Sequence, residues 1–193
     1  LIEKASVQIE NILGLSNKTI YYTSGATEAN NMAIMGICMP YINKGKHIIT
    51  TYIEHPSVYN VFKNLENLGF NVTYLKCENG IVDLDELKNA LTKDTILVSI
   101  MWVNNIIGSI QPINEVINIL KEYPRCKLHV DAVQGLGKIK NNFDLNPQKK
   151  NDITSQVLMF AFGLSAQIER DLISERTKQG LAVAKSKGKR IGR

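Results

Sequence analysis

Short apolar runs alternate with stretches of helical spacing along the first 150 residues. The runs rich in apolar and β-branched residues, which we predict to be strands, are KTIYYTSG, KHIITTYI, Asn71–Lys76, Thr95–Val103 and Lys127–Val130. The stretches predicted to be helices are Leu1–Leu13, Ala26–Met39, Pro56–Leu68, residues 84–91 and Ile113–Glu122. Pro40 would end the second of these helices, and Asp83 can cap the start of the fourth. Strands that alternate with helices predict an α/β fold of three layers, in which a mostly parallel sheet is covered on both faces.

Polar clusters follow four of the expected strands. In chain order they are TSGATE, EHPS, VNN and DAVQ. Open parallel sheets bind ligands beyond the carboxyl ends of their strands. We therefore predict that the four clusters share one binding edge.

The pattern changes after Leu145. Residues 146–154 begin with NPQKKND, whose proline and lysines indicate a linker. Beyond it, apolar residues recur three and four positions apart, at Val157, Ala161, Leu164, Ile168 and Leu172. Thr154 or Ser155 can cap the start of this helix, and Gly188 can end it. A continuous helix would be roughly 30 residues and about 50 Å long, so it must project from the α/β core or pair with another helix.

Composition is that of a soluble globular protein. The chain has 193 residues, 44% apolar and 21% charged, which predicts one domain with or without an appendage. The longest apolar run, near Ile96–Val103, is too short to span a bilayer, and no signal peptide is visible. The start at Leu1 rather than Met is typical of a fragment. Cys38, Cys77 and Cys126 are odd in number and far apart, which predicts a reducing compartment, the cytoplasm, and no disulfide framework or metal site.

The net charge of +5 is unevenly distributed. Residues 1–150 carry 15 basic and 14 acidic residues, whereas residues 151–193 carry 8 and 4. From Arg176 onward there are seven basic residues and no acidic one. This asymmetry suggests two segments with different partners.

The first two polar clusters each allow two interpretations. In SGATEANN, Gly25 lets the backbone turn closely, and the amides of Ala26 and Thr27 with the Thr27 hydroxyl would bind an anion at a helix N-terminus. The alternative is a strand-to-helix turn with a threonine cap. In EHPS, His55 could stack on a flat ring or move a proton. A solvated or structural histidine is its alternative.

The other two clusters carry amides and one carboxylate. In VNNIIG, Asn105 could donate to a phenolic oxygen, or could serve the turn alone. In HVDAVQ, Asp131 follows an apolar strand with no basic residue within two positions, and a buried carboxylate needs a partner. That partner could be a protonated pyridine nitrogen or a helix N-terminus. Gln134 could bond a ring oxygen of the same cofactor.

In this order, the four clusters resemble the cysteine desulfurase branch of the class V aminotransferases over about residues 1–145. KHIIT, GIVDLDEL and TILVSIMWVNN resemble that family as well. The resemblance implies the large-domain fold of pyridoxal phosphate transferases and the cofactor itself. By position, Ala26 and Thr27 would hold the phosphate, His55 would stack on the pyridine face, Asn105 and Gln134 would touch the ring oxygen, and Asp131 would keep the ring nitrogen protonated. One departure is Ile106, where the family usually has an acid.

A larger departure concerns the lysine that forms the Schiff base. In the family it lies some two dozen residues after the aspartate, in a Ser-x-His-Lys turn on the next strand. No lysine occurs between Lys150 and Lys178, and no Ser-x-His-Lys occurs in the sequence. Lys149 and Lys150 are expected to be solvated charges of the linker. The loop with the nucleophilic cysteine is missing too, so we expect a catalytically incompetent cofactor-binding region whose cofactor is bound weakly or not at all.

Residues 155–193 resemble another family. FAFGLSAQIERDLISERTKQGLAVAKSKGKRIGR is similar to the long helix of serine recombinases of the resolvase and invertase type. The resemblance implies a possible homodimer through residues 155–175 and non-specific contact with duplex DNA through residues 176–193. The residues that would face phosphates are Arg176, Lys178, Lys185, Lys187, Lys189, Arg190 and Arg193. A solvated basic tail is the alternative. Because the recombinase serine and its arginines are absent, no strand transfer is expected.

The sequence is therefore interpreted as two joined parts, a cysteine desulfurase N-terminal half and a recombinase helix. Three hypotheses remain open: a defective pyridoxal phosphate enzyme, a DNA-binding or dimerising module, and a product without function. In the third, a half-domain that lacks its remaining strands exposes a sheet edge and apolar faces, which favours aggregation.

Overall fold

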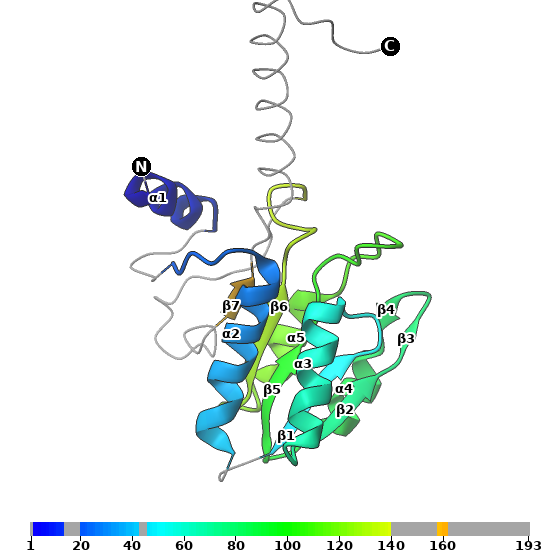
Figure 1. Ribbon diagram of the computed structural model, residues 1–193. Helices are drawn as coiled ribbons and strands as arrows, with labels where there is room; N and C mark the ends of the chain where they lie inside the picture. Colours follow the sequence, from blue (N-terminus) through cyan, green and yellow to red (C-terminus); the bar gives the residue numbers. More distant parts are fainter. Residues whose placement is uncertain (1, 14–19, 43–45, 140–157, 162–193) are drawn as a thin grey trace, which may run out of the picture.

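The computed structural model describes residues 2–13, 20–42, 46–139 and 158–161 (Figure 1). The helices are α1 (Ile2–Leu13), α2 (Ala26–Cys38), the 3-10 turn η1 (Met39–Tyr41), α3 (Pro56–Asn67), α4 (Leu84–Ala90) and α5 (Ile113–Leu120). The strands are β1 (His47–Thr51), β2 (Asn71–Leu75), β3 (Cys77–Glu78), β4 (Ile81–Val82), β5 (Thr95–Ser99), β6 (Lys127–Asp131) and β7 (Leu158–Ala161).

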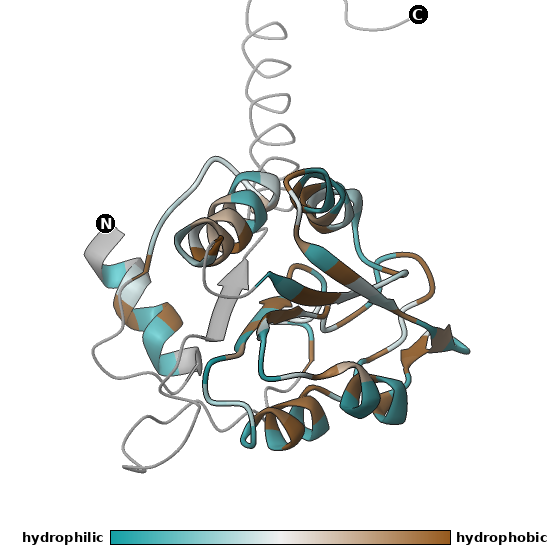
Figure 2. Cartoon of the chain, turned by 90° about the horizontal axis from the view of Figure 1, so that it is seen from below, coloured by the Kyte–Doolittle hydropathy of each residue, from teal (hydrophilic) through white to brown (hydrophobic). Residues whose placement is uncertain are grey.

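The sheet has five strands in the order β2-β1-β5-β6-β7, and every pair in it is parallel. Helices α2 and α3 lie on one face, and α4 and α5 lie on the other (Figures 1 and 2). The predicted α/β fold with a mostly parallel sheet is therefore confirmed. Parallel strands need long crossover connections, and the helices between them supply these.

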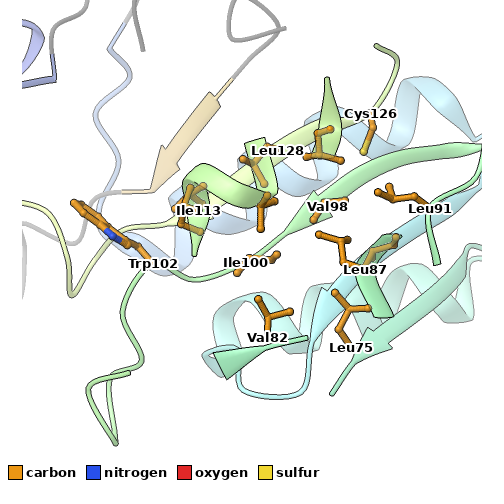
Figure 3. Packing of buried hydrophobic residues seen from close by; sticks show 14 of the residues in the cluster. Leu75, Val82, Leu87, Leu91, Val98, Ile100, Trp102, Ile113, Cys126 and Leu128 are labelled. Carbon is orange, nitrogen blue, oxygen red and sulfur yellow. The ribbon is translucent and has the colours of Figure 1, made fainter. Parts of the chain in front are cut away.

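The face covered by α4 and α5 is packed with apolar side chains (Figure 3). Val98, Ile100 and Val130 of the β5 and β6 region are completely buried there. They pack in one cluster with Ile113 and Val116 of α5. Helix α4 begins as predicted, since the carboxylate of its N-cap residue accepts hydrogen bonds from two first-turn amides.

The face covered by α2 and α3 changes character along the strands. Ile48 and Leu97, near the amino ends of β1 and β5, pack with helix residues in an apolar cluster. Two residues further on, the same face carries Thr50 and Ser99, because alternate side chains of a strand share a face. His129 lies beside Ser99 in the register of β5 and β6. All three of these polar residues are completely buried.

A short antiparallel hairpin, β3–β4, lies outside the main sheet. Asn79 and Gly80 at its turn both have positive φ, of 51° and 77°. Two consecutive residues with positive φ form the turn that fits the twist of a two-residue hairpin. This hairpin was not among the predicted elements.

The strand predicted for KTIYYTSG is wrong for its described part. Residues 20–25 form no strand, and Tyr21 is 76% exposed. A strand is defined by pairing with a neighbour, and no described strand pairs with this segment. The β-rich composition of the run was therefore not enough to make a strand.

The predicted start of the long helix at Thr154 or Ser155 also needs correction. Leu158–Ala161 form strand β7, which pairs in parallel with β6 over four residues. A short apolar run fits a buried strand as well as a helix, and the open edge of β6 selects the strand here. The predicted helix beyond Ala161 lies outside the described residues.

Candidate functional site

The carboxyl ends of β1, β5 and β6 lead into the predicted polar clusters. His55 follows β1, Asn105 follows β5, and Asp131 ends β6. Helix α2, which begins with Ala26 and Thr27, contacts β5, β6 and β7. The fold therefore brings all four clusters to the end of the sheet where the strands have their carboxyl ends, as expected for a parallel arrangement.

The N-terminus of α2 is open to a ligand. Its N-cap residue, Gly25, is extended with φ 169° and has no side chain to bond the first-turn amides. Ala26 is half-buried and Thr27 is exposed. The carboxylate of Glu28 accepts from the amide and the hydroxyl of Ser24, at 2.6 and 2.7 Å. Glu28 is therefore tied to the preceding turn, and the hydroxyl of Ser24 lowers its pKa.

Asp131 is buried, with 6% of its surface exposed. Its Oδ1 accepts from the amide of Val133 at 3.1 Å, and its Oδ2 accepts from Asn30 Nδ2 at 2.9 Å. Within the described residues, no lysine, arginine or histidine forms an ion pair with it. A buried carboxylate that is hydrogen-bonded but has no cationic partner can accept a protonated ring nitrogen.

One amide connects Asp131 with the cluster after β1. Asn30 Nδ2 also donates to Ser57 Oγ at 2.9 Å, and Ser57 Oγ lies 2.8 Å from His55 Nδ1. The amide of Ser57 donates to the same nitrogen of His55 at 3.1 Å, which caps helix α3. The imidazole of His55 is exposed, whereas Asn30 is completely buried.

The cluster after β5 contains two asparagines in different surroundings. Asn104 is buried; its Nδ2 donates to the carbonyl of Ile53, and its Oδ1 accepts from the amides of Ile106 and Ile107. Asn105 is exposed in the turn. Asn104 therefore fixes the loop to the one that carries His55, while Asn105 lies at the surface of that turn.

Gln134 lies in the turn after β6 and is half-buried. Its Oε1 accepts from Lys138 Nζ at 2.6 Å, so its amide nitrogen is the group left to donate to a ligand. The turn is packed closely on Trp102. A Cβ atom at Gly135 would lie 2.4 Å from the indole, so a larger residue there would displace the turn.

Glu54, beside His55, is a second buried carboxyl at this edge. Its Oε1 accepts from the hydroxyl of Thr51 and the amide of Met101, at 2.9 and 2.8 Å. Its Oε2 is buried and has no partner within the described residues. Burial, strengthened by the charge of Asp131, raises the pKa of Glu54 to about 8. The side chain is therefore neutral at pH 7 and joins the ends of β1 and β5.

The residues present fit the parts of pyridoxal phosphate. The uncapped N-terminus of α2 suits its phosphate, and the buried carboxylate of Asp131 suits its ring nitrogen. Sequence reasoning placed these groups but missed Asn30, Ser57 and Glu54. The quoted clusters contain all three, yet only the fold shows which side chains they reach. The seven basic residues predicted to face DNA, Arg176 to Arg193, lie outside the described residues.

Two family models match the chain. The class-V aminotransferase model matches residues 1–146, and a model described as the resolvase N-terminal domain matches residues 115–190. The matches overlap over residues 115–146, which include most of helix α5 and all of strand β6 of the main sheet. No helix in the described parts is long and apolar enough to cross a membrane. Within the same residues, no group of acidic, cysteine and histidine side chains could hold a metal ion.

Curated relatives cover the same part of the chain. A NifS/IcsS protein homolog of Lactobacillus delbrueckii subsp. bulgaricus is 53% identical over 139 residues, which is 72% of this chain and 36% of the relative. The cysteine desulfurase IscS of Dictyoglomus turgidum is 50% identical over 144 residues, which is 74% of this chain and 36% of the relative. The chain thus spans about a third of the length of these relatives.

Solved structures agree with these sequence relatives. A NifS-like protein superposes with a TM-score of 0.69 at 41% identity, over 72% of this chain and 38% of the other. DndA from Streptomyces lividans gives 0.67 at 37% identity, over 72% and 39%. The parallel sheet, the buried aspartate at its edge and the match over residues 1–146 together place the chain in the class-V aminotransferase family.

Proposed function

We propose that residues 1–145 form a pyridoxal-phosphate-binding region of the cysteine desulfurase type that holds the cofactor without a covalent bond and does not catalyse desulfuration. The observation that supports this most is the buried carboxylate of Asp131, fixed by two hydrogen bonds and without a cation in the described structure. When bound, pyridoxal phosphate supplies an electron sink. Thr27 with the amide of Ala26 would bind its phosphate, and His55 would cover one ring face.

Two further side chains would orient the ring. Gln134 would donate its amide nitrogen to the ring oxygen, since its carbonyl is occupied by Lys138. Asn105 would reach the same oxygen from the exposed turn. Asp131 would hold a proton on the ring nitrogen, because a buried anion stabilises the cationic form of its partner.

The residues available support the proposed lack of catalysis. A desulfurase of this family needs a lysine to form the Schiff base and to move the substrate's α-proton. Strand β7 follows β6 in the sheet, where the resemblance would put that lysine, and its sequence is LMFA. Lys138 is the described lysine that touches a predicted ligand of the ring, and it does so through a hydrogen bond to Gln134.

The cofactor proposal is tested by titrating the full chain with pyridoxal phosphate and following absorbance. We expect saturable binding that Asp131→Ala weakens roughly tenfold, the order of one lost hydrogen bond to a charged group. Asp94→Asn, a change at an exposed carboxylate, is the matched control and should leave the affinity unchanged. Absence of saturable binding in the wild-type chain would refute the proposal.

The absence of a Schiff base is tested separately by borohydride reduction of the mixture, followed by peptide mapping. We expect low labelling scattered over several lysines. Stoichiometric labelling of one lysine would contradict the non-covalent proposal. Lys138→Arg identifies the described candidate, since it keeps the charge and removes the primary amine.

A second candidate function rests on the match of residues 115–190 to the resolvase model and on the seven basic residues that follow Glu175. We propose that residues 176–193 contact duplex DNA without sequence preference and that residues 155–175 contribute to a homodimer. The logarithm of the binding constant should fall with the logarithm of salt concentration, with a slope of roughly −6 if all seven residues contact phosphates. Binding that ignores salt, or that survives deletion of residues 176–193, would exclude this function.

A further inference from the structure

We propose that Asn30 is a positioning residue, which ties the carboxylate of Asp131 to the imidazole of His55 through the hydroxyl of Ser57. This inference rests on the proposed cofactor site. It concerns a side chain with no assigned role, in the second turn of α2. A single buried amide would thereby set both the group that faces the ring nitrogen and the group that covers the ring.

The hydrogen bonds of Asn30 use its whole donor capacity. The side-chain nitrogen carries two protons, one directed to Asp131 Oδ2 and one to Ser57 Oγ, each at 2.9 Å. The residue is completely buried, so water does not compete with these bonds. The two partners belong to segments 27 and 101 positions away in sequence. Asn30 therefore links three of the four polar clusters.

The orientation of this amide is determined by charge. Asn30 Oδ1 is buried without a partner in the described parts of the chain. Exchanging the oxygen and the nitrogen would place Oδ1 against the carboxylate of Asp131, with two acceptors facing each other. The observed orientation leaves one acceptor unsatisfied but avoids that repulsion, which is the more costly alternative in a buried site.

The orientation of Asn30 favours one direction for the next bond. Ser57 Oγ accepts a hydrogen bond from Asn30, so its own hydrogen can be donated to His55 Nδ1, 2.8 Å away. The amide of Ser57 can only donate, and it points to the same nitrogen. Nδ1 of His55 is therefore an acceptor of two bonds. The neutral ring must carry its proton on Nε2, away from the helix.

A purely structural asparagine would join α2 to the sheet without affecting His55. The Ser57 amide alone already favours an unprotonated Nδ1, so the structural alternative predicts no change in the tautomer ratio of His55 when Asn30 is altered, whereas the proposal predicts a fall. Asn30→Asp keeps the size of the side chain but would accept from the Ser57 hydroxyl, turning its proton away from His55. Ser57→Ala removes that hydroxyl, and Ser57→Thr restores it.

The test is nitrogen-15 NMR of the histidine side chains in the ligand-free full chain. The His55 signals are assigned by a His55→Gln variant. We expect wild type to show Nδ1 unprotonated and Nε2 protonated. Asn30→Asp and Ser57→Ala should each lower the ratio of this tautomer to the other by roughly fivefold, the order of one hydrogen bond. Ser57→Thr should return to the wild-type ratio.

Asn31→Asp is the matched control, because the neighbouring asparagine donates to the carbonyl of Thr27 and takes no part in the network. It should leave the tautomer of His55 unchanged. If both Asn30→Asp and Ser57→Ala keep the wild-type ratio while still unfolding cooperatively, the proposal is overturned. If Asn30→Asp does not fold, Asn30→Ala takes its place, because it removes the donor without adding a charge beside Asp131, and an unchanged ratio in that variant overturns the proposal.

A cofactor titration of the same variants separates this inference from the proposed function. We expect Asn30→Asp to weaken pyridoxal phosphate binding. If the wild-type chain does not bind the cofactor, the proposed function fails, yet the tautomer of the ligand-free protein still supports or refutes the role of Asn30. If the cofactor binds and the tautomer does not respond, the positioning role alone is wrong.

Discussion

The two faces of the sheet differ in how they use the same strands. Under α4 and α5 the strands contribute apolar side chains along their length, and the cluster is continuous. Under α2 and α3 the apolar cluster stops halfway, and buried polar groups follow toward the carboxyl ends. One face therefore supplies stability, while the other gives up part of it to hold a hydrogen-bonded site.

The apolar face should be the more sensitive to charge. Ile100 is completely buried in it, so Ile100→Asp would bury an unpaired carboxylate at a cost of roughly 5 kcal/mol or more, comparable to the whole stability of a small domain. We expect urea denaturation to show no cooperative transition. Ile106→Asp is the control: Ile106 is 84% exposed, so its free energy of unfolding should change by about 0.5 kcal/mol or less. Equal effects at the two positions would contradict the comparison.

The buried Glu54 at the carboxyl ends of the strands should make stability fall between pH 4.5 and pH 8. The pKa of Glu54 is about 8 in the fold against an ordinary 4.5, because burial disfavours its charge. The unfolded chain loses this proton first, so the contribution of Glu54 to the free energy of unfolding is complete below pH 4.5 and is lost as pH rises to 8, by roughly 5 kcal/mol in total. Chemical denaturation across this range measures the slope. Glu54→Gln should remove most of it, and an unchanged slope would show that Glu54 is not the responsible group.

His129 should act in the opposite direction. Burial lowers its pKa to about 4 from 6.5, and its Nδ1 lies 2.8 Å from Ser99 Oγ. The unfolded chain takes up the proton first, so stability is complete above pH 6.5 and falls as pH decreases toward 4, by roughly 3 kcal/mol. Between pH 4.5 and 6.5 the contribution of Glu54 opposes this loss. Denaturation of the Glu54→Gln variant should therefore reveal the decline in full, and adding His129→Gln should abolish it.

The smallest expected effect tests a polar group on the apolar face. The Asp83 carboxylate accepts from the amides of Asp85 and Glu86 at 2.8 and 3.1 Å and caps α4. Asp83→Ala should lower the free energy of unfolding by about 1 kcal/mol, whereas Asp83→Asn keeps the acceptor and should stay near wild type. Thermal unfolding of both variants measures the difference. If Asp83→Ala lowered the free energy of unfolding as much as Ile100→Asp, the stability of the face covered by α4 and α5 would depend on more than its apolar packing.

Much of the fold could be predicted from the sequence because its signals are local. The Asp83 cap and the apolar runs of β1, β5 and β6 are contained in a few residues each, and the structure has them. The Asn79-Gly80 turn is also a local hairpin signal. Its flanking strands have only two residues each, too few for an alternating pattern to be recognised. The predicted strand before Gly25 failed because strand formation depends on a neighbour that the local sequence does not show.

The site could be predicted only as far as the side chains expected to touch a ligand. Asp131 and His55 lie just at or after the ends of strands, and polar residues at these positions in the sequence predict a ligand site. Asn30 stands inside a helix that already has a hydrophobic face, and its role depends on two segments that approach it only in the folded chain. A network between buried polar groups has no sequence period, so no repeating pattern could have revealed it.

Strand β7 has a consequence for how a parallel sheet can be extended. It lies within the residues that the resolvase model matches, yet it continues the sheet of the aminotransferase part. Strands pair through backbone N–H and C=O groups, and every residue except proline has both. The unpaired side of an outer strand can therefore pair with an apolar tetrapeptide from any protein family. A short apolar run can thus extend a parallel sheet through its backbone, whichever family its sequence resembles.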